Sequence, residues 1–345
     1  RWPAYSGDSI HPLPSPVHAM STASVSAPAQ PAALPAPAAA AQRMTQAQRL
    51  RWGMWLGVLG VACFALTMPM TRLATGSVAA PQLSPAFVTA GRLAVAGLLS
   101  AAFLLATRSA WPPRALWGSL ALATAGSAIG FPLFLALAMP HVTAAHAAVV
   151  IATLPLCTAV LSAWVLGQRA RPAFWACAVL GAVLVAVFMA LKLPESASVG
   201  GPAVSLWWPN VLLLAAVLAS ALGYAYGAKL TPVLGAERVI CWMCVSVLPA
   251  ALVLTLWWWP SEPVAPSAWG GFAYVGVVSM WAGFFAWFRG LDWGGALRVS
   301  QVQLLQPFGS MLVAWPLLGE AVSPLAVGFA LAVVATVWLA KRMSS

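Results

Sequence analysis

Arg92 is the side chain best suited to hold a charged group, because it stands inside an apolar stretch from residue 85 to residue 107. It follows Pro85 by seven residues, which places it about 10 Å along a helix that begins at the proline. No Asp or Glu occurs between Met44 and Ala190. The cation must be satisfied by backbone carbonyls, polar side chains, an acid from a later part of the chain or an anionic group of a bound molecule. A binding role and a role in tying helices together both remain open.

Polar side chains also gather in a later apolar stretch. Ser300, Gln303 and Pro307 recur at the spacing i, i+3, i+7 and so share one helical face, with Gln306 beside them. Side-chain amides can bind a polar or zwitterionic group without burying a charge. Ser300, Gln303 and Gln306 are therefore candidate binding residues, and interhelical hydrogen bonding is the alternative role.

Three further side chains could contribute to a site. Tyr224 and Trp281 lie deep in apolar stretches and could wall a pocket, with packing or lipid contact as the alternative. His146 lies one turn into the apolar stretch 143–166. Since histidine takes up a proton near physiological pH, His146 is a candidate for proton coupling, or it only meets water and headgroups at a helix end.

The chain lacks the residue patterns of an enzyme. It has no cluster of carboxylates, no metal-ligand array and no nucleophile–base motif, so we expect no catalytic residue, metal or cofactor. Cys241 and Cys244 form a C-x-x-C spacing without a second pair. We interpret them as small apolar residues inside a buried helix.

Composition identifies the elements that carry these residues. Hydrophobic residues make up 62% of the chain and charged residues 7%, whereas about a quarter of an ordinary soluble domain is charged. The net charge of +11 comes from cations at the ends of apolar stretches, which favours membrane topology over binding to nucleic acid. The sequence predicts an all-α integral membrane protein in the lipid bilayer. Residues 1–43, rich in Pro and Ala, are predicted to be a disordered tail.

Ten apolar segments are long enough to be membrane spans. They run over residues 52–70, 85–107, 115–138, 143–166, 172–191, 209–228, 237–259, 268–288, 296–318 and 322–340.

A block of sequence recurs 152 positions later without a gap. Trp117-Gly118 returns as Trp269-Gly270, Pro155 as Pro307, and Leu166-Gly167 as Leu318-Gly319. We therefore predict two five-helix repeats, over residues 52–191 and 209–341. Pro155, Pro307 and also Pro69 are expected to bend their helices around a central cavity.

The distribution of cations indicates that the repeats are inverted. An odd number of helices per repeat turns the second copy upside down. The linker Gln168–Pro172 contains two cations, whereas its counterpart in the second copy, Glu320–Pro324, contains none. With the amino terminus inside, the outer loops contain only Arg72 and Lys192. The inner loops and tails contain Arg43, Arg49, Arg51, Arg108, Arg114, Arg169, Arg171, Lys229, Arg238, Arg289, Arg298, Lys341 and Arg342. Both termini are therefore predicted to be cytoplasmic.

At these residues the chain resembles the drug/metabolite transporter superfamily and, within it, the EamA family of ten-helix permeases. The resemblance covers residues 52–341 and is most specific from Thr143 to Gly167 and from Ala296 to Glu320. Gln168 departs from the family's Leu-Gly-Glu linker, and Phe64-Ala65 stands where relatives often have Trp-Gly.

The resemblance implies a permease of the bacterial inner membrane that moves a small metabolite by alternating access, through export of an amino acid or a related organic solute. An uptake or exchange carrier for an anionic metabolite, anchored by Arg92, is the alternative. A membrane scaffold or enzyme is a remote third reading. Proton coupling and a homodimer are left open.

Overall fold

The computed structural model describes residues 45–165, 172–197, 207–294, 299, 302–321 and 323–344, and every structural statement below refers to these residues. The predicted tail 1–43, the linker residues 166–171 and Ser300 lie outside them. We call residues 45–197 the first half and residues 207–344 the second half.

The described chain is almost entirely helical, apart from one isolated bridge between Gly76 and Pro81. The helices of the first half are α1 Gln46–Ala65, α2 Thr67–Thr75, α3 Pro85–Ala106, η1 Arg114–Leu116, α4 Trp117–Ala123, η2 Thr124–Gly130, α5 Phe131–Ala138, η3 Met139–His141, α6 Ala144–Ile151, α7 Leu154–Val165 and α8 Pro172–Ala197. Those of the second half are α9 Trp207–Leu234, α10 Ala236–Trp257, α11 Pro266–Ala273, η4 Tyr274–Ala282, α12 Gly283–Gly294, η5 Val302–Leu305, α14 Gln306–Leu318 and α15 Pro324–Ser344.

The helix ends follow local sequence signals. Thr45 and Gln48 form a capping box at the start of α1, and the Ser84 hydroxyl accepts from the Phe87 amide before Pro85 opens α3. Such caps satisfy amides that the first helical turn leaves without a partner. Gly319 ends α14 with a φ of 67°, a left-handed conformation that glycine adopts at little cost.

Six helical stretches are long and apolar enough to cross a membrane by length and composition. They are Gln46–Thr75, Pro85–Ala106, Arg114–His141, Trp207–Leu234, Ala236–Trp257 and Pro266–Gly294. Four shorter apolar stretches are Ala144–Thr158, Trp175–Phe188, Val302–Leu318 and Pro324–Leu339. A multi-pass membrane protein is therefore shown, while the count of ten spans stays a prediction.

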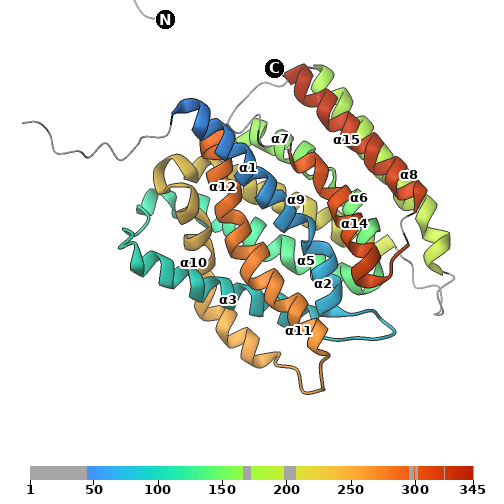
Figure 1. Ribbon diagram of the computed structural model, residues 1–345, viewed down its shortest axis with the longest axis horizontal. Coiled ribbons are helices and arrows are strands. Elements are labelled where there is room, and N and C mark those ends of the chain that lie inside the picture. Colours follow the sequence, from blue (N-terminus) through green and yellow to red (C-terminus); the bar gives the residue numbers. More distant parts are fainter. Residues whose placement is uncertain are drawn as a thin grey trace, which may run out of the picture. The chain divides into compact units, whose positions relative to one another are not determined.

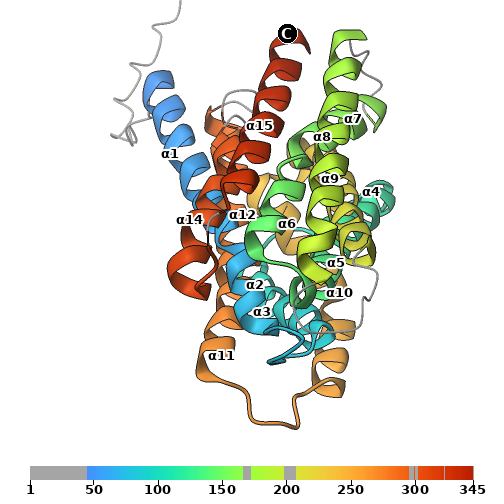
Figure 2. The same cartoon turned by 90° about the vertical axis from the view of Figure 1, so that its right-hand side faces the viewer.

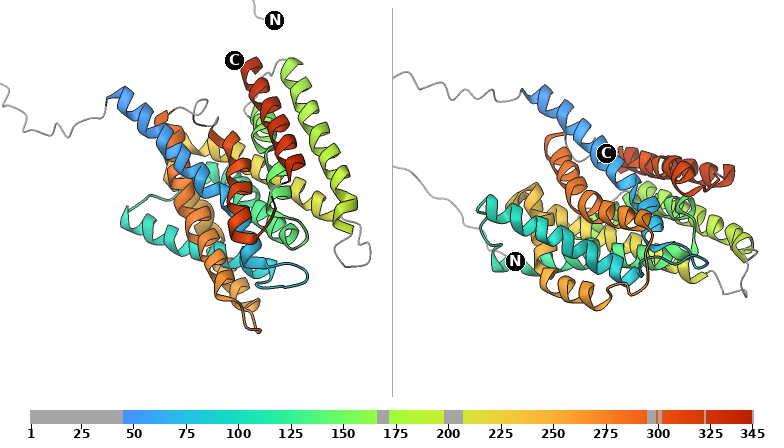
Figure 3. Two further views of the ribbon diagram at one scale, coloured as in Figure 1. Left: turned by 45° about the vertical axis from the view of Figure 1, so that its right-hand side comes forward. Right: turned by 60° about the horizontal axis from the view of Figure 1, so that its bottom comes forward.

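Helices from the two halves pack against each other in matching pairs. α1, the first helix of the first half, packs along α12 of the second half. In the same way α9, the first helix of the second half, packs along α5, which is the counterpart of α12 in the first half, and along the adjoining α4. α3 lies along α10 and α8 along α15 (Figure 1), the latter pair being side by side in Figure 3 as well. α6 packs on α14; in Figure 2, α14 lies at the left and α6 nearer the centre. If each helix is replaced by its counterpart in the other half, the same pairs of helices result.

Two of these contacts bring backbones close together through glycine. A Cβ on Gly290 of α12 would lie 2.8 Å from the backbone nitrogen of Gly57 in α1. A Cβ on Gly126 of η2 would lie 2.6 Å from the backbone nitrogen of Gly223 in α9. Small residues permit such packing in lipid, where no hydrophobic force drives helices together.

Both halves also contain a π-helical segment at the same place in the duplication. η2 ends at Gly130 and η4 ends at Ala282, 152 positions later. A π-helical turn changes the direction in which the following side chains project, and such turns are frequent at functional sites.

Candidate functional site

Two neighbouring cavities lie where helices of both halves meet. The larger has a volume of about 400 Å³ and the smaller about 230 Å³. They share two lining residues, Leu154 and Gln306, which are 152 positions apart. The larger cavity is lined by Phe64, Thr67, Arg92, Ser127, Phe131, Leu154, Ser220, Tyr224, Ser279, Met280, Phe284 and Gln306.

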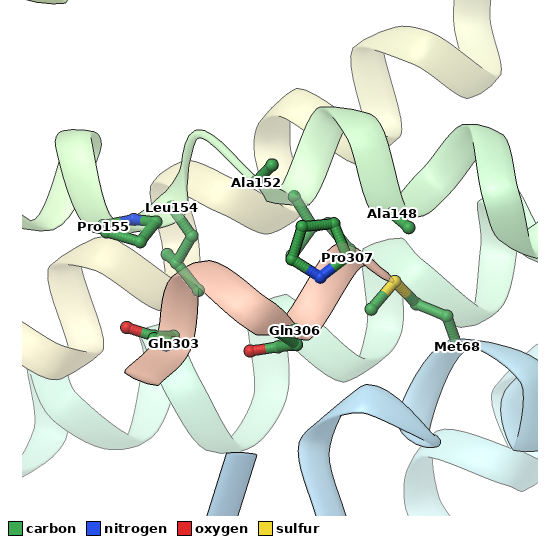
Figure 4. Close-up of a pocket in the computed structure, with 9 residues that line it drawn as sticks. Met68, Ala148, Ala152, Leu154, Pro155, Gln303, Gln306 and Pro307 are labelled. Atoms are coloured by element: carbon green, nitrogen blue, oxygen red, sulfur yellow. The ribbon is translucent and has the colours of Figure 1, made fainter. Parts of the chain in front are cut away.

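The smaller cavity is built around interrupted helices. α6 ends at Ile151 and α7 begins at Leu154, immediately before Pro155. In the second half, the short η5 gives way to α14 at Gln306, immediately before Pro307. Figure 4 shows Leu154 and Pro155 near Gln303, Gln306 and Pro307, with Met68 of α2 beside them. Since proline lacks an amide hydrogen, helix interruptions before both prolines leave irregular backbone facing a cavity.

Pro69, the third predicted bend, lies buried in α2 just after the interruption between α1 and α2 at Leu66. Its neighbour Met68 lines the smaller cavity.

Arg92 is 2% exposed and lines the larger cavity. Its Nη2 donates to the hydroxyl of Ser279 at 3.3 Å and lies 3.8 Å from the sulfur of Met280. Its Nε has no hydrogen-bond partner among the described residues. Within the described residues, no carboxylate forms an ion pair with Arg92. The cation is thus held by neutral groups of the other half of the chain.

Two serines at equivalent positions of the duplication flank this region. Ser127 of η2 and Ser279 of η4 are 152 positions apart, and both line the larger cavity. The Ser279 hydroxyl lies 2.7 Å from that of Thr67. The Ser127 hydroxyl is buried, and no described residue is its hydrogen-bond partner. The π-helical segments therefore bring one hydroxyl from each half to the same cavity.

Aromatic rings form much of the remaining wall. Phe64 and Phe284 meet edge to face, with centroids 5.0 Å apart, and Tyr224 meets Phe284 in the same way at 6.3 Å. Phe131 completes the aromatic part of the lining. Trp281 packs on Phe285 at 4.7 Å and is not among the residues that line the two cavities.

Both candidate amides reach these cavities. Gln303 lines the smaller cavity, where its Nε2 is buried and has no hydrogen-bond partner in the described part of the chain. Gln306 lines both. Ser300, the third residue of that predicted face, lies outside the described residues.

His146 is placed apart from the cavity lining. It lies in the first turn of α6, where its Nε2 is 2.7 Å from the Oδ1 of Asn210 in α9. Its ring packs against Phe188, with centroids 5.0 Å apart.

Sequence reasoning missed two features. The carboxylate of Glu320 accepts from the backbone amides of Ala144 and Ala145, at 3.0 and 3.3 Å, and so joins the halves at the start of α6. No local signal pairs residues so far apart in the chain. The hydroxyls of Ser127 and Ser279 were also missed, although their recurrence at 152 positions lies within the duplicated block and could have identified them.

Comparison with known proteins agrees with this architecture. The model of the EamA-like transporter family matches residues 51–191 and again residues 207–341. An uncharacterized transporter, YdeK of Bacillus subtilis (strain 168), is 39% identical over 293 residues, which cover 84% of this chain and 97% of that protein. One crystal structure of a protein superposes with a TM-score of 0.56 at 21% identity, covering 85% of this chain and 97% of the other. That likeness shows the fold alone.

Proposed function

The chain belongs to the EamA-like transporter family of the drug/metabolite transporter superfamily, and from that membership we propose that it exports a small metabolite, an amino acid or a related organic solute, across the bacterial inner membrane. A transporter of this family is a permease and needs no catalytic residue. The site we propose for the solute is the pair of cavities that share Leu154 and Gln306.

The observation that carries this proposal is that both halves of the chain contribute side chains to the lining of the larger cavity. The larger cavity takes side chains from α1, α2, α3, η2, α5 and α7 of the first half and from α9, η4, α12 and α14 of the second. A relative movement of the halves would change contacts with a bound solute, and such differential contacts are what an alternating-access cycle requires.

The matching helix pairs support the proposal that the halves are repeats related by a two-fold axis, and the distribution of basic residues supports their inversion. α1 with α12 and α9 with α4 and α5 are equivalent contacts, as expected for two copies related by a two-fold axis. With the basic residues on the inner side, both termini would be cytoplasmic.

Transport can be tested with purified protein in sealed lipid vesicles. Preloaded vesicles should release one or more members of a broad panel of labelled metabolites faster than protein-free vesicles, whichever way the protein is oriented in the vesicle membrane. Absence of flux for every compound, with folded protein in the membrane, would contradict the proposal.

A second candidate is uptake or exchange of an anionic metabolite, and the acid-free surroundings of Arg92 favour it. Arg92→Gln should abolish flux of the anion while the protein still folds, whereas Arg92→Lys should retain part of it because the charge remains. Unchanged flux in Arg92→Gln would remove this candidate.

Proton coupling through His146 is also a proposal. The Nε2 contact with Asn210 joins α6 to α9, so protonation would alter a contact between the halves. Flux measured with and without an imposed pH gradient tests it, and His146→Gln should remove any dependence on the gradient. Dependence that survives in His146→Gln would show that another group carries the proton.

A further inference from the structure

Four hydrogen-bond donors from four separate elements meet at the larger cavity. They are Arg92 of α3, Thr67 of α2, Ser127 of η2 and Ser279 of η4. Two of their polar atoms, Arg92 Nε and Ser127 Oγ, are buried and have no hydrogen-bond partner among the residues that the structure describes. Buried polar groups almost always have a partner, so an unmatched donor in a cavity wall indicates an acceptor supplied by a ligand.

Charge determines what kind of acceptor fits. Arg92 brings one positive charge, and none of the described residues that line either cavity is an Asp or a Glu. A buried cation without a counter-charge is costly, and a ligand that supplies one negative charge removes that cost. A cationic ligand would instead meet Arg92 as a like charge.

An ammonium group would meet only neutral groups in the described part of the lining. Away from Arg92, its possible acceptors are the amide oxygen of Gln306 and the hydroxyls of Ser220 and Tyr224, and the rest of the wall is mainly apolar: Phe64, Phe131, Phe284 and Leu154. These groups provide no negative charge to offset the desolvation of an ammonium. The carboxylate of an amino acid would match the donors, but its ammonium would enter the cavity without a counter-charge.

The apolar part of the wall indicates the body of the ligand. The edge-to-face rings of Phe64 and Phe284 and the neighbouring Phe131 offer flat apolar surface.

We infer that the cavity binds an organic acid with a single negative charge and an apolar, aromatic-sized body, and that it selects against the corresponding amino acid. The carboxylate binds Arg92, Ser127 and Ser279, and the body packs on Phe64, Phe131 and Phe284. This inference rests on the proposed transport function and narrows its solute from amino acids and related compounds to carboxylic acids that lack an ammonium group.

Four compounds in which two carbons separate a phenyl ring from a polar group distinguish the effects of the ligand's charge on binding. 3-Phenylpropanoate is an anion, phenylalanine a zwitterion, phenethylamine a cation and 3-phenylpropanamide neutral. Binding to the purified full-length chain is measured by calorimetry or thermal shift. 3-Phenylpropanoate should bind tightest, and each of the others should bind at least about tenfold more weakly, as expected when a charged hydrogen bond is lost. Equal or tighter binding of phenylalanine or of the amide would overturn the inference, as would absence of binding by all four.

Variants locate the carboxylate. Ser127→Ala should weaken binding of 3-phenylpropanoate about fivefold and leave the weak binding of the amide unchanged. Ser100→Ala is the matched control, because it removes a buried hydroxyl from α3 outside both cavities. Arg92→Gln should abolish the preference for the acid over the amide. If Arg92→Gln does not fold, the ranking of the four compounds by the unmodified protein and the Ser127→Ala result still decide the matter.

Failure of this inference is distinguishable from failure of the transport proposal. Vesicles that transport phenylalanine but not 3-phenylpropanoate would overturn the inference and leave transport in place. Selective binding of 3-phenylpropanoate without any flux would support the inferred site and contradict transport.

Discussion

At the scale of single residues, the two halves differ most clearly where the cavities meet. Leu154 of the first half and Gln306 of the second occupy equivalent positions and line both cavities. Gln303 likewise stands where the first half has Ile151. The first half therefore shows which apolar residues this backbone accommodates, and these residues suggest replacements that test binding separately from folding.

Gln306→Leu should raise the substrate concentration needed for half-maximal flux by about tenfold, because one hydrogen bond to the solute is lost at the shared wall. Thermal stability should change little, since leucine is the residue at the equivalent position 154. Gln303→Ile is the comparison in the smaller cavity. If Gln306→Leu leaves flux unchanged and lowers stability, the amide serves helix packing instead.

Part of the candidate site follows from single residues. Residue type and position predict a binding role for four residues that line the cavities, and binding itself stays a prediction: Arg92, Gln303, Gln306 and Tyr224. Trp281 was selected by the same reasoning but packs on Phe285 outside the lining, because depth in a span does not specify which face of a helix meets a cavity.

At the scale of the elements, the start of α6 is held by a residue that comes after α14. The Glu320 carboxylate accepts from two amides of the first turn, in addition to the Thr143 hydroxyl that accepts from the His146 amide. An anion at a helix amino terminus interacts favourably with the helix dipole and satisfies unpaired amides.

Glu320→Gln should lower the free energy of unfolding by about 1 kcal/mol, because the charge at the start of α6 is lost. The measurement is thermal or denaturant unfolding in detergent. Glu262→Gln is the matched control, since this acid lies exposed in the loop between α10 and α11. Equal effects of the two substitutions would show that the contact with α6 contributes nothing specific.

The close packing of α1 and α12 gives a second prediction at this scale. Gly290→Ala should lower the free energy of unfolding by about 1 to 3 kcal/mol, because its Cβ would lie 2.8 Å from the Gly57 backbone nitrogen. Gly270→Ala is its control in α11, where an added Cβ meets no atom within 4 Å. That control should be neutral or slightly stabilising, since alanine favours helix. A destabilisation of both to the same degree would contradict the importance of this contact.

The sequence predicts where the helices lie along the chain better than it predicts which helices pack against each other. The positions of the apolar helices and of the interruptions near Pro155 and Pro307 follow from composition, periodicity and the missing amide of proline. The contact of Glu320 with α6 and the packing of α1 on α12 join residues far apart in the chain, and no local propensity encodes such pairs. The internal repeat is the exception, because it relates Ser127 to Ser279 across the same distance.

At the scale of the whole molecule, orientation in the membrane is the property that the proposed mechanism needs. The basic residues predict that the loop between α10 and α11 faces out, and that the loop between α3 and η1 faces the cytoplasm.

A single cysteine at each loop tests this orientation in intact cells. On a background without the five native cysteines, Ser261→Cys should react with a membrane-impermeant maleimide added outside. Ser109→Cys should react only after the membrane is permeabilised. The opposite pattern would show that the protein has its termini outside.

Leu154 and Gln306 also bear on the energetics of a complete transport cycle. In an inverted-repeat carrier with identical halves, the inward-facing and outward-facing states would be degenerate, with equal populations and equal affinities on both faces. On the proposed inverted-repeat mechanism, Leu154 and Gln306, which line both cavities, would make the two states unequal in energy. The empty protein would then favour one state, and half-saturation would come at different solute concentrations on the two sides. When no ion is coupled, detailed balance requires that the net driving force for transport is still the solute's own concentration gradient. A difference between the halves at this position would therefore change the equilibrium between the two states of the carrier. Accumulation of the solute against its gradient requires a second, coupled flux.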